Sequence, residues 1–303
     1  MELRHLRYFV AVAQELHFAH AAQRLNIEQS PLSRAIKDLE ADLGTPLFIR
    51  TSRKTRLTHA GERLLQNVPR VFAALQQARD SVHAAALGFR KELRIALSDD
   101  IPCARLATIL AHSHRNDPAT DLRLFPVPLA QQLQGLHDDL YDLGFAQSAE
   151  VGTGIVAQPL WNDPIMVALP AKHPLLQHPQ LTLEQLEGYP LVLYDTALCE
   201  GHARQVDHLL RNARIEPQII QRMASWDLLL VMVCACQVLG LTSASHITAH
   251  RELGIEGRPL AGPTPLITTY LLRPAVEPSA ALLRFLELLR SPSTCPLAAT
   301  QAQ

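Results

Sequence analysis

Residues 18–44 read FAHAAQRLNIEQSPLSRAIKDLEADLG, and their apolar residues recur at helical spacing in two groups. The first group predicts a short helix, and the second predicts a longer helix that ends at Gly44. Only a short turn separates the two helices. The two groups are Phe18, Ala21, Ala22 and Leu25, followed by Leu32, Ile36, Leu39 and Leu43.

A further apolar stripe precedes this stretch and predicts another helix near the start of the chain. Three small helices with a tight second connection are typical of a helix-turn-helix unit. The core of such a unit is small, so we expect it to be stabilised by the chain that follows. The stripe consists of Leu6, Phe9, Val10, Ala13 and Leu16.

The third helix begins with polar residues that would face the major groove of DNA if the helix docks there. Gln and Arg side chains can make paired hydrogen bonds to adenine and guanine edges, and Ser can bind bases or phosphate. We expect Lys37 to contact phosphate. The alternative for each residue is an ordinary exposed polar position on a helix. The candidate DNA contacts here are Gln29, Ser30, Ser33, Arg34 and Lys37.

A basic hairpin is predicted directly after the third helix. Residues 47–50 (LFIR) are strand-like, residues 51–56 (TSRKTR) form a polar tip, and the chain returns at Leu57. Clustered cations attract phosphates, and Arg can enter a narrow minor groove. A solvated charged hairpin is the alternative. The cations of this predicted wing are Arg50, Arg53, Lys54 and Arg56.

Apolar residues spaced alternately four and three apart then predict one long helix with a narrow apolar seam. Thr58 is its predicted N-cap, Gly88 its end, and Pro69 a kink in its axis. The same helix of a second chain is the simplest partner and gives a two-fold dimer. Packing against its own chain is the alternative. The seam consists of Leu64, Val68, Val71, Leu75, Ala78, Val82 and Ala85.

The composition supports two units with different partners. The chain has 303 residues, of which 48% are hydrophobic, and this excludes a disordered or fibrous protein. Its net charge of −1 conceals an asymmetry, because residues 1–90 carry 13 Lys and Arg against 8 Asp and Glu, whereas the remainder carries 15 against 21. Proline follows the same division, with 18 of 21 after residue 90. The basic first part favours a nucleic-acid partner.

No part of the sequence indicates a membrane or secreted protein. The N-terminus lacks the apolar run of a signal peptide, and the longest apolar stretch, residues 228–236, is far shorter than the roughly 20 residues that cross a bilayer. Five scattered Cys indicate reduced thiols, so we expect a cytoplasmic protein with no membrane contact. Cys234 and Cys236 point to different sides of a predicted helix, which favours buried apolar thiols over a metal site; a redox role is the alternative.

From residue 91 onward, predicted strands and helices alternate, which favours parallel sheets covered by helices. Open sheets of this kind bind ligands beyond the carboxyl ends of their strands. The predicted strands are 93–97, 122–127, 142–146, 155–160, 165–169, 191–194, 218–223, 241–243 and 268–272. The predicted helices are 105–113, 129–138, 202–212, 225–239 and 280–289.

The motifs of several enzyme classes are absent from the sequence. It contains no Gly-x-Ser-x-Gly, no P-loop and no Gly-x-Gly-x-x-Gly. His112 and His114 face two sides of a predicted helix, which favours a surface position over a ligand role. We therefore expect no catalytic residue, no metal and no cofactor. A solute-binding module without a role in transcription is the alternative function.

The first 90 residues resemble the winged helix-turn-helix and linker helix of LysR-type transcriptional regulators. The resemblance implies a winged helix-turn-helix domain over 1–58, a linker and dimerisation helix over 59–89, and an effector-binding domain over 90–303. One departure is Glu28 before Gln29, where the family commonly has Ser or Thr, because Glu is a poorer N-cap and places a negative charge near DNA. The matching residues are MELRHLRYF at 1–9, Ala21-Ala22, Leu25, Gln29, Leu32-Ser33-Arg34, Ile36, Leu39-Glu40, Leu43-Gly44, Leu47-Phe48, Arg50, Leu57-Thr58 and Ala60-Gly61.

The resemblance extends more loosely over the rest of the chain. Residues 160–175 (LWNDPIMVALPAKHPL) are similar to the crossover between the family's two regulatory subdomains, and residues 267–272 are similar to the return strand. This implies two Rossmann-like α/β subdomains arranged as in periplasmic binding proteins. Subdomain I would comprise 90–161 and 267–303, and subdomain II would comprise 162–266. A small-molecule effector would bind in the hinged cleft between them.

The LVLY at 191–194 and Asp142-x-Gly144-Phe145 are most similar to regulators of aromatic-compound breakdown. Those members place hydroxyl and Arg groups where a dicarboxylate binds, whereas this chain has Asp99, Leu129 and Gln147. An Asp in a desolvated cleft repels an anion, so we expect a neutral or cationic effector, or one bound through Gln147 and Tyr194. The alternative is that Asp99 and Asp100 cap the following helix. The candidate effector contacts are Ser98, Asp99, Asp100, Leu129, Gln147, Tyr194 and Asp195.

A second departure lies within residues 231–245, where the family usually has a Gly pair. Here those positions are Cys236 and Val238, with Gly240 displaced, so we expect a reshaped turn. As a whole, the resemblance implies a DNA-binding transcriptional regulator, and an activator in preference to a repressor. Its expected partners are double-stranded promoter DNA with an interrupted inverted repeat, a small-molecule effector, RNA polymerase, and further copies of the chain in a homodimer or homotetramer.

Overall fold

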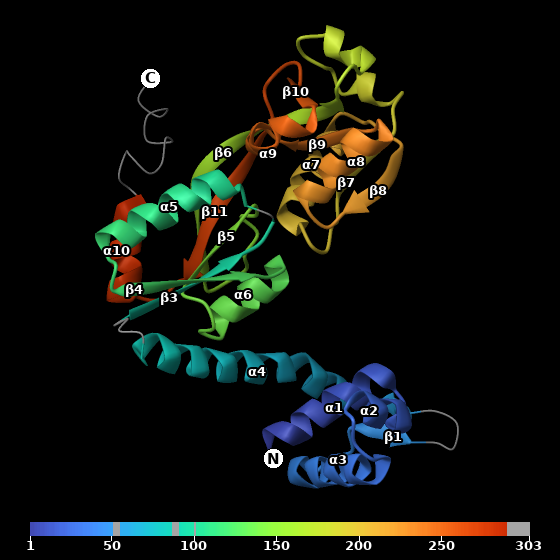
Figure 1. The fold of residues 1–303 in the computed structure, drawn as a ribbon, viewed down its shortest axis with the longest axis vertical. Coiled ribbons are helices and arrows are strands. Elements are labelled where there is room, and N and C mark those ends of the chain that lie inside the picture. The colour runs from blue at the N-terminus through green and yellow to red at the C-terminus, as the bar shows by residue number, and fades with distance from the viewer. Residues whose placement is uncertain (51–54, 87–90, 100, 290–303) are drawn as a thin grey trace. The chain divides into compact units, whose positions relative to one another are not determined.

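The fold is described from a computed structural model, which covers residues 1–50, 55–86, 91–99 and 101–289. Figure 1 shows the helices and strands. The chain divides into two compact units, Met1–Asp80, called the head here, and Ser81–Gln303, called the body. Helix α4 (His59–Ala86) runs across this division, whereas the sequence placed boundaries near residues 58 and 89.

The head contains the three predicted helices, α1 (Leu3–Glu15), α2 (Phe18–Arg24) and α3 (Gln29–Leu43). Helix α3 ends at Gly44 in the left-handed conformation, with φ 67°, as the sequence predicts. The apolar residues at helical spacing meet in one core, where the rings of Phe9 and Phe48 lie 5.5 Å apart. The fully buried members of this core include Leu6, Val12, Ala21, Leu32, Ile36, Leu39 and Leu47.

A short antiparallel hairpin follows α3 and consists of β1 (Phe48–Arg50) and β2 (Thr55–Leu57). The carboxylate of Glu40 accepts hydrogen bonds from the backbone N–H groups of Leu47 and Phe48, at 2.8 and 3.2 Å, so α3 holds the first strand. The Oγ1 of Thr58 accepts from the Gly61 N–H at 3.0 Å and thereby caps α4, as predicted.

Helix α4 continues through Pro69, and its apolar seam packs in part against its own chain. Its first turns pack on the head, where Val68 is buried and Leu64 is half-buried. Further along, Val71 is 41% exposed and Val82 is 72% exposed. Gly88, the predicted end of this helix, lies outside the described residues.

The body is built on a mixed sheet whose strands follow the order β4-β3-β5-β11-β6-β9-β7-β8, with β10 also paired to β6. Parallel pairing joins β3 to β4 and β5, and β7 to β8 and β9, whereas β6 and β11 are antiparallel. The strands are β3 (Lys91–Leu97), β4 (Thr120–Pro126), β5 (Leu143–Ala146), β6 (Ile155–Pro170), β7 (Leu191–Tyr194), β8 (Ile219–Met223), β9 (Leu239–Ser243), β10 (Ile255–Pro259) and β11 (Leu266–Pro274).

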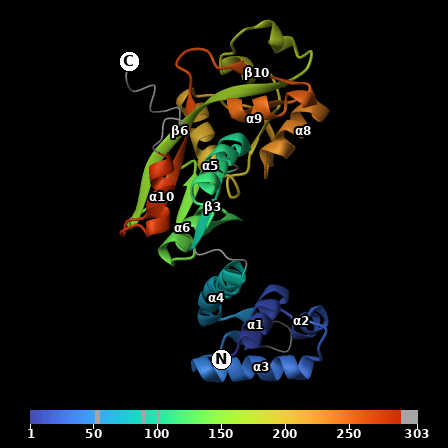
Figure 2. The ribbon, with the colours of Figure 1, turned by 60° about the vertical axis from the view of Figure 1, so that its left-hand side comes forward.

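The strands and the helices that cover them form two lobes, which Figures 1 and 2 show from different sides. Lobe I contains β3, β4 and β5 with α5 (Cys103–Asn116), α6 (Leu129–His137) and α10 (Ala280–Leu289). Lobe II contains β7, β8, β9 and β10 with α7 (Glu200–Asn212), α8 (Trp226–Cys236) and α9 (Ala244–Ala249). The long strands β6 and β11 pair with each other, β11 also pairs with β5 of lobe I, and β6 also pairs with β9 and β10 of lobe II. The two strands therefore form the connections between the lobes.

Several sequence predictions for the body were wrong in detail. The two strands predicted within 155–169 are one strand, β6, because β11 pairs with it from Ile155 to Pro164 across the predicted break. Helix α8 ends at Cys236 and not at residue 239, and Gln237 takes the left-handed conformation, φ 56°, in which Gly is usual. Cys234 and Cys236 are exposed, whereas Cys199 is buried.

The structure also contains elements that the sequence did not predict. These are the helix α9, the strand β10, and the short 3₁₀ helices η1 (Pro174–Gln177), η2 (Glu184–Leu186) and η3 (Arg251–Leu253). None of the described helices is long and apolar enough to span a bilayer.

Candidate DNA-binding face and ligand cleft

One side of α3 is built into the head and the other side is open to solvent. Leu32, Ile36 and Leu39 are fully buried in the core. Their opposite face carries all five polar residues singled out on this helix, and these surround one surface depression. The five residues are Gln29, Ser30, Ser33, Arg34 and Lys37.

The N-cap of α3 is Glu28, as the sequence implied, and its side chain makes no capping hydrogen bond. The residue is exposed. A carboxylate beside a helix N-terminus is favourable for the helix dipole but repels the phosphates of DNA. The helix therefore starts without the hydroxyl cap that is common in such helices.

One of the predicted wing cations, Arg56, has a described and solvent-exposed side chain on the hairpin. Arg56 lies in β2, opposite Ile49 of β1, and is exposed. Arg53 and Lys54 lie outside the described residues, as does the side chain of Arg50, whose backbone forms the end of β1. Arg56 is therefore the one cation of the predicted wing whose side chain lies within the described residues, and the role of the wing stays a prediction.

A cavity of about 370 Å³ lies between the lobes, beyond the carboxyl ends of β3 and β4. Lobe I contributes residues from the ends of these strands, and lobe II contributes the loops that precede α7 and α8. Most of the lining side chains are apolar. The lining residues are Leu97, Ser98, Asp99, Ile101, Leu106, Pro126, Val127, Pro128, Leu198, Cys199, Ala224 and Ser225.

Asp99 extends from lobe I to lobe II at the edge of this cavity. Its Oδ1 accepts a hydrogen bond from the Gly201 N–H, in the first turn of α7, at 2.6 Å. Its Oδ2 accepts from the Gln147 N–H at 3.0 Å and from the Ser98 Oγ at 3.1 Å. Asp99 therefore caps α7 of the other lobe. The alternative that it caps the following helix was wrong, because α5 begins after Pro102 without a side-chain cap.

The side chains of Gln147 and Tyr194 point into the protein interior. The Gln147 Oε1 lies 3.0 Å from the Nδ1 of His202, and the Tyr194 hydroxyl lies 3.0 Å from the Oγ1 of Thr242. All four residues are buried. Complete burial lowers the pKa of His202 to about 3, and the nearby His246 adds to this effect. These side chains form a polar network under the cleft and do not line the cavity.

The remaining candidates have other positions. Leu129 begins α6 and is buried in a core cluster with Leu136 and Ala146. The Oδ1 of Asp195 accepts from the N–H groups of Ala197 and Leu198, at 2.8 and 3.1 Å, within its own loop. Asp100 lies outside the described residues. Of the described candidates, Ser98 and Asp99 line this cavity, whereas Gln147 lines a second cavity of about 510 Å³.

Sequence reasoning missed the polar face of α7. The Nε2 of Gln205 donates to the Gln147 carbonyl at 2.6 Å, and Arg204 pairs with Glu150 at 2.7 Å, so α7 is joined to the loop after β5 of lobe I. These residues line a second, more polar cavity of about 510 Å³. The signal was present in the sequence, since Gly201, Arg204, Gln205, His208 and Arg211 follow helical spacing.

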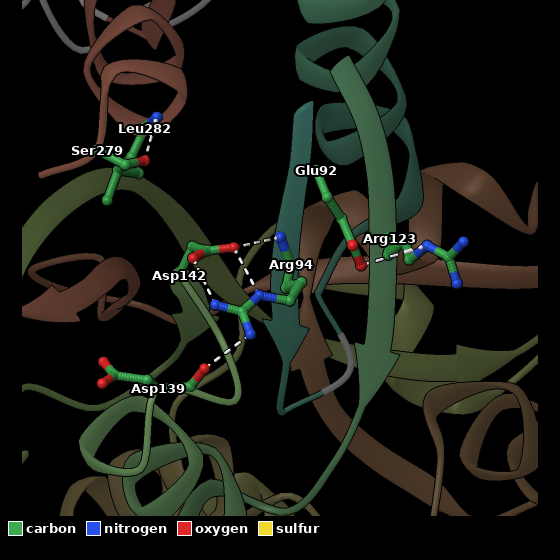
Figure 3. A network of polar contacts seen from close by, with 7 residues as sticks. All are labelled: Glu92, Arg94, Arg123, Asp139, Asp142, Ser279 and Leu282. Carbon is green, nitrogen blue, oxygen red and sulfur yellow. Dashed lines mark hydrogen bonds and ion pairs between the residues drawn. The ribbon is translucent and has the colours of Figure 1, made fainter. Parts of the chain in front are cut away.

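A polar network, drawn in Figure 3, joins β3 to the residues directly before β5. Ser98 and Asp99 directly follow β3, so this network helps to fix their position. The guanidinium of Arg94 binds both carboxylate oxygens of Asp142, at 3.0 and 2.8 Å, and donates to the Asp139 carbonyl at 2.7 Å. Asp142 also accepts from the Arg94 N–H at 2.8 Å. At the edge of β3 that pairs with β4, burial raises the pKa of Glu92, whose Oε1 lies 3.4 Å from the Nε of Arg123.

No metal centre is formed within the described part of the chain, where no three His, Cys, Asp or Glu residues are grouped to hold an ion. His112 is half-buried and His114 is exposed on α5. The candidate functional features are therefore the two cavities between the lobes, which can hold a small molecule, and the polar face of α3, which can contact DNA.

Comparison with known proteins identifies both units. Residues 3–62 match the model of the bacterial regulatory helix-turn-helix protein, lysR family, and residues 86–292 match that of the LysR substrate binding domain. The Hca operon transcriptional activator HcaR of Escherichia coli K12 is 31% identical over 96% of this chain and 97% of its own. The regulator CatR of Pseudomonas putida is 36% identical over 69% of this chain and 70% of its own.

A solved structure gives the same result for the fold. Full-length CbnR in complex with its target DNA aligns with a TM-score of 0.74 and 27% identity, over 96% of this chain and 99% of that one. The resemblance drawn from the sequence is thus confirmed, and so is the fold class of a helical head with a two-lobed α/β body. The chain belongs to the LysR family and is a DNA-binding transcriptional regulator with an effector-binding domain.

Proposed function

We propose that this regulator activates transcription by binding an interrupted inverted repeat in promoter DNA and by responding to a small effector between its lobes. The observation that carries the DNA-binding part is the face of α3 on which Gln29, Arg34 and Lys37 lie together with two serines. HcaR and a probable cat1 operon regulator of Acinetobacter lwoffii are both described as transcriptional activators, which supports activation. Contact with RNA polymerase in the cytoplasm belongs to this proposal.

The residues of the head divide into two roles. Gln29, Ser33 and Arg34 read base edges in the major groove, where a bidentate contact discriminates between bases. Lys37 and the wing bind phosphate, which supplies affinity that decreases with salt. Arg50, Arg53 and Lys54 are assigned to the wing from the sequence. Ser30, at the start of the helix, is placed to bind a base or a phosphate.

A dimer supplies the second half of the DNA site. The apolar seam of α4 is exposed at Val71 and Val82, so a second copy of the helix has an apolar surface to cover. A two-fold axis through this contact places the two recognition helices on half-sites related by inversion. A pair of such dimers forms the tetramer.

The effector is a small compound that carries no net negative charge. The cavity of about 370 Å³ is mostly apolar, and no Arg, Lys or His is among its described lining residues. The charged side chain at its edge is the carboxylate of Asp99. A neutral, largely apolar molecule fits this lining best, and a cation is the second choice, because burying an unpaired charge against apolar side chains is costly.

The DNA-binding proposal is tested on promoter fragments recovered by genome-wide binding-site capture. On a recovered site at fixed salt, Arg34→Ala should weaken specific binding by about 1–3 kcal/mol, while binding to unrelated DNA changes much less. Arg63→Ala is the control, because Arg63 lies on α4 and donates to Gln66 at 3.1 Å, so it removes one positive charge from the same unit. Equal losses in the two variants, or none in Arg34→Ala, would overturn the assignment.

A further inference from the structure

We infer that Asp99 is an internal carboxylate that occupies an anion position between the lobes, holds them together there, and excludes carboxylate effectors from that position. The inference deepens the proposed function of the cleft and rests on it for the statement about effectors. The structural part concerns the hydrogen bonds of one side chain. It can be tested without DNA.

The geometry is that of an anion held by donors from two lobes. Lobe II contributes the Gly201 N–H at 2.6 Å, and lobe I contributes the Gln147 N–H at 3.0 Å and the Ser98 hydroxyl at 3.1 Å. Asp99 is 2% exposed, so these donors, and not water, satisfy its carboxylate oxygens. Charged hydrogen bonds at the start of a helix are among the stronger polar contacts in proteins.

Two backbone features indicate that the surroundings are built around this carboxylate. Asp99 has φ 61°, a left-handed conformation that is uncommon for non-glycine residues, and the three hydrogen bonds of its side chain hold it there. Position 201 is glycine, and a Cβ there would lie 2.6 Å from the Asp99 Oδ2 and 2.7 Å from the Gln147 carbonyl oxygen. The carboxylate can therefore reach the α7 N–H only because residue 201 has no side chain.

The anion position is connected to the cavity. Ser98 and Asp99 are both lining residues, so removing the Asp99 side chain would open the three donors to the cavity of about 370 Å³. The lobes would stay joined by β6 and β11 and by the hydrogen bond from Gln205 to the Gln147 carbonyl. A free carboxylate of small size could then take the place of the missing one.

The test is rescue of Asp99→Gly in the full chain by acetate, formate and benzoate, with sodium chloride at equal ionic strength as reference. Glycine relieves the left-handed backbone and leaves room for the anion. We expect the unfolding midpoint of the variant to fall by about 5 °C or more and to rise again, with saturation, as acetate or formate is added. The unsubstituted protein should show no such response, because its own carboxylate fills the position.

Two controls make the result specific. Asp99→Asn keeps the shape and fills the space, so it should lose stability without being rescued. Asp195→Gly also removes a carboxylate that accepts two backbone N–H groups, but within one half-exposed loop, and should not respond to acetate. If Asp99→Gly does not fold in chloride, the yield of refolded protein in acetate is compared with that in chloride, and this comparison replaces the unfolding midpoint.

The inference is overturned if carboxylates stabilise Asp99→Gly no more than they stabilise the unsubstituted protein or Asp195→Gly. It is also overturned if both Asp99→Gly and Asp99→Asn are as stable as the unsubstituted protein, because the hydrogen bonds of the carboxylate would then contribute no stability. Rescue by acetamide, the neutral analogue of acetate, would equally contradict a position that selects anions. Failure of the DNA-binding proposal would appear separately, as lost specificity in operator binding with the rescue intact.

Discussion

His202 is a buried imidazole whose protonation should make the body sensitive to acid. Burial, aided by His246, lowers its pKa from the ordinary 6.5 to about 3. Between these values the unfolded chain binds a proton that the folded chain does not. The stabilising contribution is therefore complete above pH 6.5 and is lost as pH falls towards 3, by up to about 1.4 kcal/mol per pH unit.

His202→Asn should flatten this pH dependence. The Asn amide can still donate towards Gln147, as the imidazole Nδ1 does, but it does not titrate. Free energies of unfolding in urea between pH 5 and pH 7 check the prediction. His59→Asn is the control for the same substitution at the surface, since its ring is 87% exposed. Identical slopes for His202→Asn and the unsubstituted protein would contradict it.

At this scale the sequence predicted residues on a helix surface better than residues in the cleft. Gln29, Arg34 and Lys37 could be grouped because helical spacing alone fixes which side chains share a face. Gln147 and Tyr194 could not be assigned, because their partners His202 and Thr242 lie 55 and 48 residues away in the chain. A sequence pattern can indicate where a strand ends, but it does not show which distant residue lies beside that end in the folded protein.

At the scale of elements, the pairing of Arg94 with Asp142 fastens β3 to β5. Both side chains are about four-fifths buried, and the guanidinium binds the carboxylate through two nitrogens. Asp142→Asn removes the charge that the Nε and one terminal nitrogen of Arg94 bind. We expect a loss of about 2 kcal/mol in the free energy of unfolding, measured in urea.

The matched control is Glu150→Gln, which also removes a carboxylate paired with an Arg. Glu150 is 81% exposed, and exposed pairs contribute about 0–1 kcal/mol. The two variants should therefore differ clearly, and equal losses would mean that the Arg94 pair does not hold the strands. Asp142→Asn should also loosen the hydrogen bonds of Asp99, because Asp99 follows β3 by two residues.

The sequence predicted elements well where one periodicity extends over many residues. The helices α3 and α10 and the strands β7 and β3 follow such patterns. The single strand β6 was missed because Asn162, Asp163 and Pro164 interrupt its apolar pattern, while pairing with β11 keeps the backbone extended. The end of α8 was misplaced because Gln237 takes a left-handed backbone directly after Cys236, although the departure from the family's Gly pair indicated a reshaped turn in this region.

At the scale of the whole molecule, the near-zero net charge results from a basic head and an acidic body in one chain. An excess of Lys and Arg in residues 1–90 favours phosphate, and an excess of Asp and Glu beyond residue 90 disfavours it. Acidic bodies on neighbouring copies also repel one another. The apolar seam of α4 must therefore supply attraction between copies in the proposed dimer.

Val82→Glu tests this requirement on the full-length protein. Val82 is 72% exposed in the single chain and occupies a seam position, so a two-fold contact would bring two glutamates together and bury them. We expect the variant to dissociate into monomers in analytical ultracentrifugation at concentrations where the unsubstituted protein is dimeric or larger, and to lose most of its affinity for a two-half-site operator. Val276→Glu, at a 67% exposed valine of the body, should retain both properties. If Val82→Glu remains associated while Val276→Glu does not, the copies meet through the body and α4 is not the dimer contact.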